Sequence, residues 1–81
     1  MPKIFEWDGY KFFFFSNEGN PQEPCHVHVR KGDKIAKYWI LPEVSIESSW
    51  GMSSKELNLL EEKINENCSF IEEKWNEFFS K

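Results

Sequence analysis

The stretch HVHVRKGDKIAKYWIL, residues 26–41, decides the fold, because it holds two runs of alternating side chains on either side of a two-residue turn. The turn is the Gly-Asp pair at 32–33, and glycine in its first position favours a type II′ hairpin. Alternation on both sides predicts strands over residues 26–31 and 34–41. Pro42 then ends the second strand, because proline has no backbone N–H to donate to a sheet.

The same turn fixes the register of this hairpin, and the register gives the predicted sheet two unlike faces. Val29 is expected opposite Ala36, and the pairing continues outward from the turn. Because successive side chains of a strand point to opposite faces, an apolar set gathers on the face where we expect the core: Val27, Val29, Ala36, Tyr38 and Ile40. The other face gathers a polar and aromatic set that we expect at the surface, as a candidate binding site: His26, His28, Arg30, Lys37 and Trp39.

A second hairpin is predicted on the N-terminal side. Residues 4–7 and 10–16 flank Asp8-Gly9, which is a strong signal for a two-residue turn. The expected cross-strand pairs are Trp7 with Tyr10, Glu6 with Lys11, Phe5 with Phe12 and Ile4 with Phe13. Opposite charges make Glu6 and Lys11 a favourable pair. Residues 17–24 are rich in Asn, Gly and Pro, so they are expected to form a loop between the hairpins.

The C-terminal part of the chain predicts a helix. Ser53 and Glu56 have the spacing of a capping box that opens a helix. A second capping box, Ser69 with Glu72, allows a bend or break near Asn67, but the unbroken phase of the apolar stripe favours one long helix. The stripe consists of Leu57, Leu60, Ile64, Cys68, Ile71, Trp75 and Phe78.

Residues 44–48 predict a short fifth strand before this helix. The expected fold class is therefore α+β: an antiparallel sheet of four to five strands, built around two hairpins and packed on one C-terminal helix. No repeat, linker or low-complexity tract interrupts the sequence, so residues 1–81 are expected to form a single domain.

The run Phe12–Phe15 places two phenylalanines on each face of the sheet, so both faces need cover. One helix is about 10 Å across, which is less than four strands at about 4.8 Å spacing. Two explanations are open. Either residues 17–24 and 42–52, with Trp50, fold over the remaining aromatic side chains, or these side chains form a contact patch for a partner or a second copy.

Composition and charge narrow the class of protein. The formal charge of −4 disfavours a dedicated nucleic-acid binder, and we find no DNA-binding motif. The charge is uneven, because residues 24–41 are mainly basic, whereas residues 53–81 hold seven glutamates against four lysines. No apolar run approaches the roughly 20 residues needed to cross a bilayer, so no membrane contact is expected.

The two cysteines, Cys25 and Cys68, are too few for a disulfide scaffold. The start Met1-Pro2-Lys3 lacks the apolar run of a secretory signal. We therefore expect a cytoplasmic protein with reduced thiols.

His26 and His28 have the spacing that lets two imidazoles on one side of a strand chelate a metal ion. Zinc normally takes three or four protein ligands, and Cys25 points to the opposite face. We therefore expect neither a metal nor a cofactor. The sequence His-Val-His-Val at 26–29 partly matches the motif of the histidine-triad nucleotide hydrolases. Arg30 occupies the position where that motif has its third histidine.

RNA binding is a further interpretation of the same face. Trp39 could stack a base while Arg30 and Lys37 contact phosphates. The two histidines could also supply general acid and base catalysis for RNA cleavage, because imidazole titrates near neutral pH.

The chain resembles a known family through five segments in order: FFFFSNEG at 12–19, PCHVHV at 24–29, AKYW at 36–39, EL at 56–57 and WNEF at 75–78. The resemblance is to domain-of-unknown-function family 4160, although Cys25 replaces the second proline of the usual motif. It implies a small bacterial protein, often encoded beside another small uncharacterised protein, in an arrangement that suggests a toxin–antitoxin-like pair. The family motif falls here on Asn17, Glu18, His26, His28, Lys37 and Trp39, and it implies no reaction.

The sequence thus favours a non-enzymatic interaction module that binds a small protein partner or a second copy of itself. Its motivation is the surplus of aromatic side chains together with the resemblance. The alternative hypothesis is an RNA-binding protein or ribonuclease-type toxin that uses the His26 and His28 face.

Overall fold

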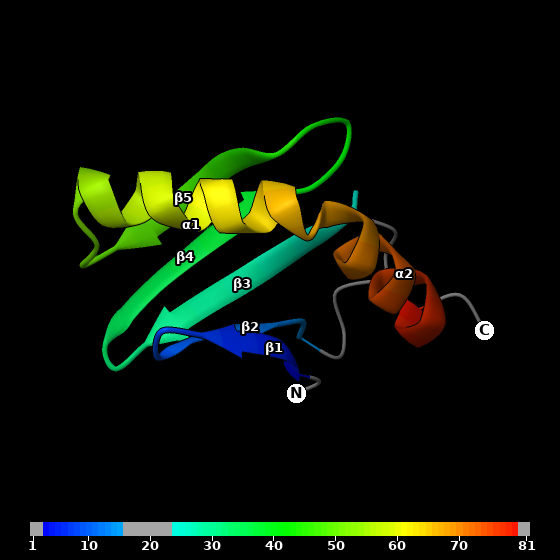
Figure 1. The fold of residues 1–81 in the computed structure, drawn as a ribbon, viewed down its shortest axis with the longest axis horizontal. Coiled ribbons are helices and arrows are strands. Elements are labelled where there is room, and N and C mark those ends of the chain that lie inside the picture. The colour runs from blue at the N-terminus through cyan, green and yellow to red at the C-terminus, as the bar shows by residue number, and fades with distance from the viewer. Residues whose placement is uncertain (1–2, 16–23, 80–81) are drawn as a thin grey trace.

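The computed structural model describes residues 3–15 and 24–79. Figure 1 shows a five-stranded antiparallel sheet, in the order β1-β2-β3-β4-β5, followed by two helices. The strands are β1 (Lys3–Trp7), β2 (Tyr10–Phe13), β3 (His26–Lys31), β4 (Lys34–Trp39) and β5 (Ser45–Trp50), and the helices are α1 (Ser54–Glu66) and α2 (Cys68–Phe79). The predicted α+β class is confirmed. Neither described helix combines the length and the apolar character that crossing a membrane requires.

Both hairpin turns have the predicted geometry. Asp8 and Gly9 have positive φ angles of 51° and 81°, as a type I′ turn requires, and Gly32 has a φ of 61° at the first turn position. The β3–β4 register agrees with the prediction, because Val29 lies opposite Ala36 and the pairing continues outward to His26 opposite Trp39. In the first hairpin the pairing shifts between Lys3 and Phe5, so Lys3 rather than Ile4 faces Phe13 and that predicted pair is wrong.

β5 is longer than predicted and ends at Trp50, which is 66% exposed. The interpretation that residues 42–52, with Trp50, fold over the remaining aromatic side chains is therefore wrong for β5 and Trp50, although Val44 and Met52 pack against the core. The physical reason is that β4 offers a free edge, and pairing with it satisfies the backbone of residues 45–50. The other half of that interpretation concerns residues 17–23, which lie outside the described residues.

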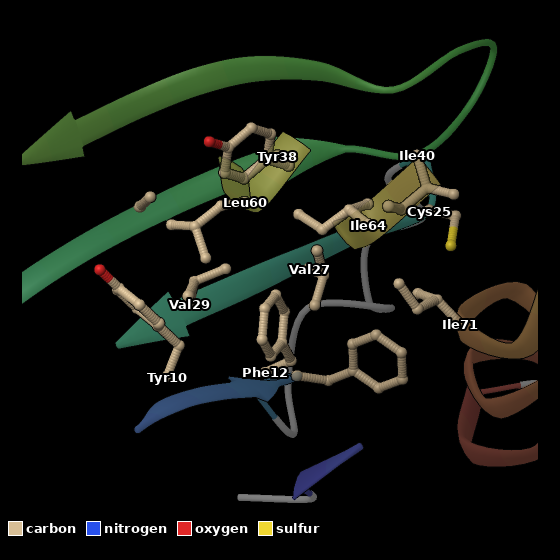
Figure 2. Packing of buried hydrophobic residues seen from close by; sticks show 12 residues of the cluster. Tyr10, Phe12, Cys25, Val27, Val29, Tyr38, Ile40, Leu60, Ile64 and Ile71 are labelled. Carbon is tan, nitrogen blue, oxygen red and sulfur yellow. The ribbon is translucent and has the colours of Figure 1, made fainter. Parts of the chain in front are cut away.

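α1 packs on one face of the sheet and forms the core with it (Figure 2). Leu60 and Ile64 from α1, together with Ile71 from α2, are fully buried against the face that carries Val27 and Val29. The Tyr38 hydroxyl donates a hydrogen bond of 2.7 Å to the Leu57 carbonyl oxygen, and burial raises the pKa of this phenol. The apolar face predicted as core is confirmed, and it lies under the helix.

The C-terminal segment forms two helices rather than one continuous helix. The predicted capping box opens α1, because the Glu56 N–H donates to Ser53 Oγ and the Ser53 N–H donates to Glu56 Oε1. At the other end Asn67 has φ −117° and ψ 14°, and its side-chain amide donates to the Lys63 carbonyl oxygen at 2.8 Å. α2 begins at Cys68, so Ser69 lies inside its first turn instead of capping it. The break allows α2 to turn toward the end of the sheet where β3 begins (Figure 1).

Glu56 ties the start of α1 to the sheet. Its Oε2 accepts hydrogen bonds from the Tyr10 hydroxyl at 2.7 Å and from Lys34 Nζ at 2.9 Å. Hydrogen bonds to the carboxylate lower the pKa of Glu56 from 4.5 to about 2. The largest effect comes from the Tyr10 hydroxyl, followed by the Ser53 N–H and Lys34. The same hydrogen bond raises the pKa of Tyr10 to about 12.

A carboxyl group with a lowered pKa in the folded state stabilises the protein above its unfolded pKa and loses this effect as the pH falls. We therefore expect the Glu56 contribution to be complete at pH 7 and to disappear between about pH 4.5 and pH 2. Urea unfolding across this range should show that Glu56→Gln is less stable than the parent at pH 7, with the difference shrinking toward pH 2. Glu66→Gln, on an exposed side chain, is the control. An equal difference at both pH values would contradict this assignment.

Candidate functional site

The face of the sheet opposite α1 brings the candidate residues together, and we call it the open face. Cross-strand pairing defines it, because residues paired directly across strands share a face. One row runs Lys11–Arg30–Ile35–Trp50, the next Phe13–His28–Lys37–Ser48, and the third His26–Trp39–Ser45. The prediction that His26, His28, Arg30, Lys37 and Trp39 share one face, opposite the valines, is confirmed.

His26 is the exception to the expectation that this set is accessible, because its side chain is fully buried. Its Nδ1 lies 2.9 Å from the Pro24 carbonyl oxygen, and its ring centroid is 5.0 Å from Trp75 and 5.5 Å from Trp39. The physical reason is the break at Asn67, which lets α2 bring Trp75 over the end of β3. The expectation of a surface imidazole is wrong here, and His26 is part of the packing.

His28 is half-buried in a cluster of rings on the open face. Its centroid lies 5.7 Å from Phe13 in a stacked arrangement, 4.4 Å from Phe15 and 5.2 Å from His26. Beside it, Lys37 Nζ lies 4.7 Å from the centre of the Trp39 ring. These contacts bury most of Phe13 and leave Phe15 37% exposed.

A hollow of about 280 Å³ opens in the middle of this face, and we call it the aromatic hollow. Its walls are formed by Phe13, Phe15, His28, Val29, Ile35, Ala36, Lys37, Ser48 and Ser49. The wall side chains are mostly apolar, which suits an apolar group better than a charged one.

A second hollow of about 410 Å³ lies between the two hairpin turns, and we call it the basic notch. It is lined by Lys3, Gly9, Lys11, Phe13, Arg30, Lys31 and Gly32. The sequence pattern did not reveal it, because the pairing of β2 with β3 spans the loop between the hairpins. Glu6 and Lys11 face each other across the first hairpin, as predicted, and Glu6 Oε1 also accepts from Lys3 Nζ at 3.2 Å.

The residues that the structure describes do not favour a metal site or a reactive thiol. Residues 3–15 and 24–79 contain no group of three or more His, Cys, Asp or Glu side chains that could hold a metal ion. Cys25 is buried and Cys68 is partly buried, and neither forms a disulfide in the structure. Burial, with a smaller effect of the Glu72 carboxylate, raises the pKa of the Cys25 thiol to about 12, so the reactive thiolate is scarce near neutral pH. Asn17 and Glu18, the other candidate binding residues, lie outside the described residues.

Comparison with known proteins gives one match. A family model with the description "Domain of unknown function (DUF4160)" matches residues 9–76, which is more than half of the chain. No curated protein and no solved structure gives a significant match.

Proposed function

The chain belongs to the DUF4160 family, a domain of unknown function, and from its open face we propose that it is a non-enzymatic interaction module that binds a protein partner. The observation that carries this proposal is the exposure of large apolar side chains on the open face, opposite the face on which α1 packs. Trp50, Ile35 and Phe15 are 66%, 50% and 37% exposed there. Apolar side chains grouped in this way on a small protein usually mark a contact surface.

The size of the open face limits the kind of interface that it can form. Five strands at about 4.8 Å spacing and strands of about six residues give a face roughly 20 Å on each side. This projected area of about 400 Å² is below the roughly 800 Å² that each partner buries in a standard interface, so it suits a small or transient contact. The aromatic hollow at its centre provides a pocket for an anchoring apolar side chain of the partner.

Charge favours a different protein over a second copy on this face. Lys11 and Arg30 give the open face positive charge, so two open faces stacked together would repel. A copy that instead docked its glutamate-rich helices there would make a head-to-tail contact, which builds rings or open-ended chains rather than a closed dimer. We therefore propose a partner with acidic and apolar side chains, and homodimerisation through this face becomes an outcome to test.

The paired-gene arrangement that the family resemblance implies makes the neighbouring gene product the first partner to test. We propose a toxin–antitoxin-like pair as one setting, in which this module would act by holding its partner. RNA binding is the second candidate, because the exposed Trp50 ring lies on the same face as Lys11 and Arg30. RNA cleavage by two histidines has less support, because a fully buried His26 presents no surface to a substrate.

The test compares two equally exposed apolar residues on different faces. Ile35 on the open face is 50% exposed, and Leu59 on α1 is 45% exposed. With the purified neighbouring gene product, calorimetry should show that Ile35→Glu weakens binding at least about tenfold, because it places a carboxylate in an apolar contact. Leu59→Glu should change the affinity less than about twofold.

A photo-cross-linking residue placed at each of these two positions extends the test to the source cells. We expect one protein to be captured from position 35 and not from position 59, and to bind the purified chain. Equal capture from both positions, or equal loss of affinity in the two glutamate variants, would overturn the proposal. A dimer detected by light scattering and lost in Ile35→Glu would replace the partner with a second copy.

A further inference from the structure

Lys11 and Arg30 face each other directly across β2 and β3. Like charges in such a position destabilise a strand pair, because their Cβ atoms lie only about 4.5–5.5 Å apart. In the part of the chain that the structure describes, neither side chain forms an ion pair, and Glu6 is engaged by Lys3. Arg30 Nε donates to the Gly32 carbonyl oxygen at 3.2 Å, which positions the side chain without neutralising it. Lys11 also faces Glu6 on β1, whereas Arg30 faces only Lys11 and Ile35, so no carboxylate of the described strands offsets the charge of Arg30 from directly across the sheet.

The two cations lie in the wall of the basic notch rather than on a flat surface. Lys31 adds a third positive charge to the wall, with its Nζ held 4.5 Å from the centre of the Tyr10 ring. Gly32 leaves room on one side, because a Cβ atom there would meet nothing within 4 Å. An anionic group can therefore approach the cations from solvent.

The basic notch and the aromatic hollow share Phe13 as a common wall. A group bound in one hollow therefore lies next to a group bound in the other. The combination is an anion-binding hollow beside an apolar one, along a single face.

We propose that the basic notch binds the carboxylates of an acidic segment of the partner, whose adjacent apolar side chain enters the aromatic hollow. Carboxylates suit the site, because the Arg30 guanidinium offers a planar fork of donors and Lys11 offers a compact charge. An acidic segment also supplies the negative charge that the chain itself does not place between Lys11 and Arg30. This assignment rests on the proposed function for the identity of the occupant, and it adds the chemistry by which the occupant is recognised.

The test uses Lys11→Glu, which supplies a carboxylate opposite Arg30 from within the chain. Lys55→Glu, on an exposed α1 residue away from the notch, makes the same charge change and is the control. The probe is a short glutamate-rich peptide that ends in leucine, titrated against the chain at constant ionic strength. NMR should show shifts at the amides of Lys11 and Arg30, and Lys11→Glu should weaken binding at least about fivefold while Lys55→Glu weakens it less than about twofold.

Thermal unfolding provides the second readout. The variant for this readout is Arg30→Glu, which should weaken peptide binding as Lys11→Glu does. Without peptide, Arg30→Glu should raise the melting temperature by about 2–4 °C, because it places a carboxylate opposite Lys11 and leaves Glu6 facing Lys11 on the other side. A gain in stability together with a loss of binding identifies charges kept for recognition. An unchanged or lower melting temperature would show that the two cations do not oppose each other and would overturn the proposal.

Three other outcomes also decide against the acidic segment. These are no amide shift with the peptide, equal weakening by Lys11→Glu and Lys55→Glu, and tighter binding of a single-stranded RNA of equal charge at the same amides. Failure here differs from failure of the proposed function. If Ile35→Glu abolishes partner binding and Lys11→Glu does not, the proposed function is supported and the assignment of the basic notch is wrong. If the peptide binds at the basic notch but no protein partner is found, the assignment of the notch is supported and the proposed function is not.

Discussion

Replacing Phe12 with alanine should destabilise the protein by about 3–5 kcal/mol, the usual cost of removing a buried phenylalanine ring. Phe12 is fully buried, and its ring stacks on Phe5 with centroids 4.4 Å apart and planes 11° apart. On its other side it belongs to the cluster that α1 covers (Figure 2). A domain of this size has a total stability of roughly 4–12 kcal/mol, so this one cavity removes a large share of it.

The matched control is Phe15→Ala, in the same run of four phenylalanines but on the open face. Phe15 is 37% exposed and contacts Phe13 and His28 edge-on. We expect a loss of less than about 1.5 kcal/mol, because much of the ring already faces water. Urea unfolding followed by circular dichroism measures both variants. Equal losses would mean that the two faces of the sheet are equally covered, and the open face would then not be available to a partner.

The two hairpins were predictable from the sequence because their information is local. A two-residue turn with glycine sets the register of both its strands, so the pairs on either side of Gly32 follow from the turn alone. The opening of α1 was predictable for the same reason, since Ser53 and Glu56 satisfy each other within one turn of helix. The single mispaired position, Ile4, lies at the far end of its hairpin, where the turn constrains the register least.

The contacts between hairpins were not predictable, because they depend on how distant segments meet. The pairing of β2 with β3 brings Lys11 opposite Arg30, and no local pattern specifies that register across residues 17–24. The surplus of aromatic side chains on the sheet was predictable from alternation. The extension of β5 to Trp50 could not be predicted, because an exposed edge strand has little hydrophobic alternation to mark its ends.

The candidate site shows the same division between local and tertiary information. Alternation correctly placed five side chains on one face, but it could not distinguish the buried His26 from the accessible part of the set. Burial of His26 depends on α2 leaving the line of α1 at Asn67. The second capping box marked the position of that break without indicating where the following helix would go. The helical spacing of the apolar residues continues through the break, because both helices bury residues of the same stripe. These are Leu60 and Ile64 on α1 and Ile71 on α2.

Replacing Trp75 with alanine tests this role of α2. Trp75 packs on Phe14, His26 and Phe79, with ring centroids 5.1, 5.0 and 4.2 Å away. Because the indole is partly exposed, we expect a loss of about 3 kcal/mol, at the lower end of the range for removing a tryptophan. The control is Phe78→Ala, three residues further along α2, where the side chain is 37% exposed. This variant should lose less than about 1.5 kcal/mol of folding stability.

A chemical readout separates loss of cover from general destabilisation. Diethyl pyrocarbonate modifies accessible imidazoles, and mass spectrometry of the peptides distinguishes His26 from His28. His26 should be protected in the parent and in Phe78→Ala, because Trp75 still covers it, and it should react in Trp75→Ala under conditions where that variant is folded. If His26 reacts at the same rate in the parent and in Trp75→Ala, α2 does not cover the end of β3. The two imidazoles would then again be available together on the open face, and RNA cleavage by the histidine pair would regain the support that burial of His26 removes.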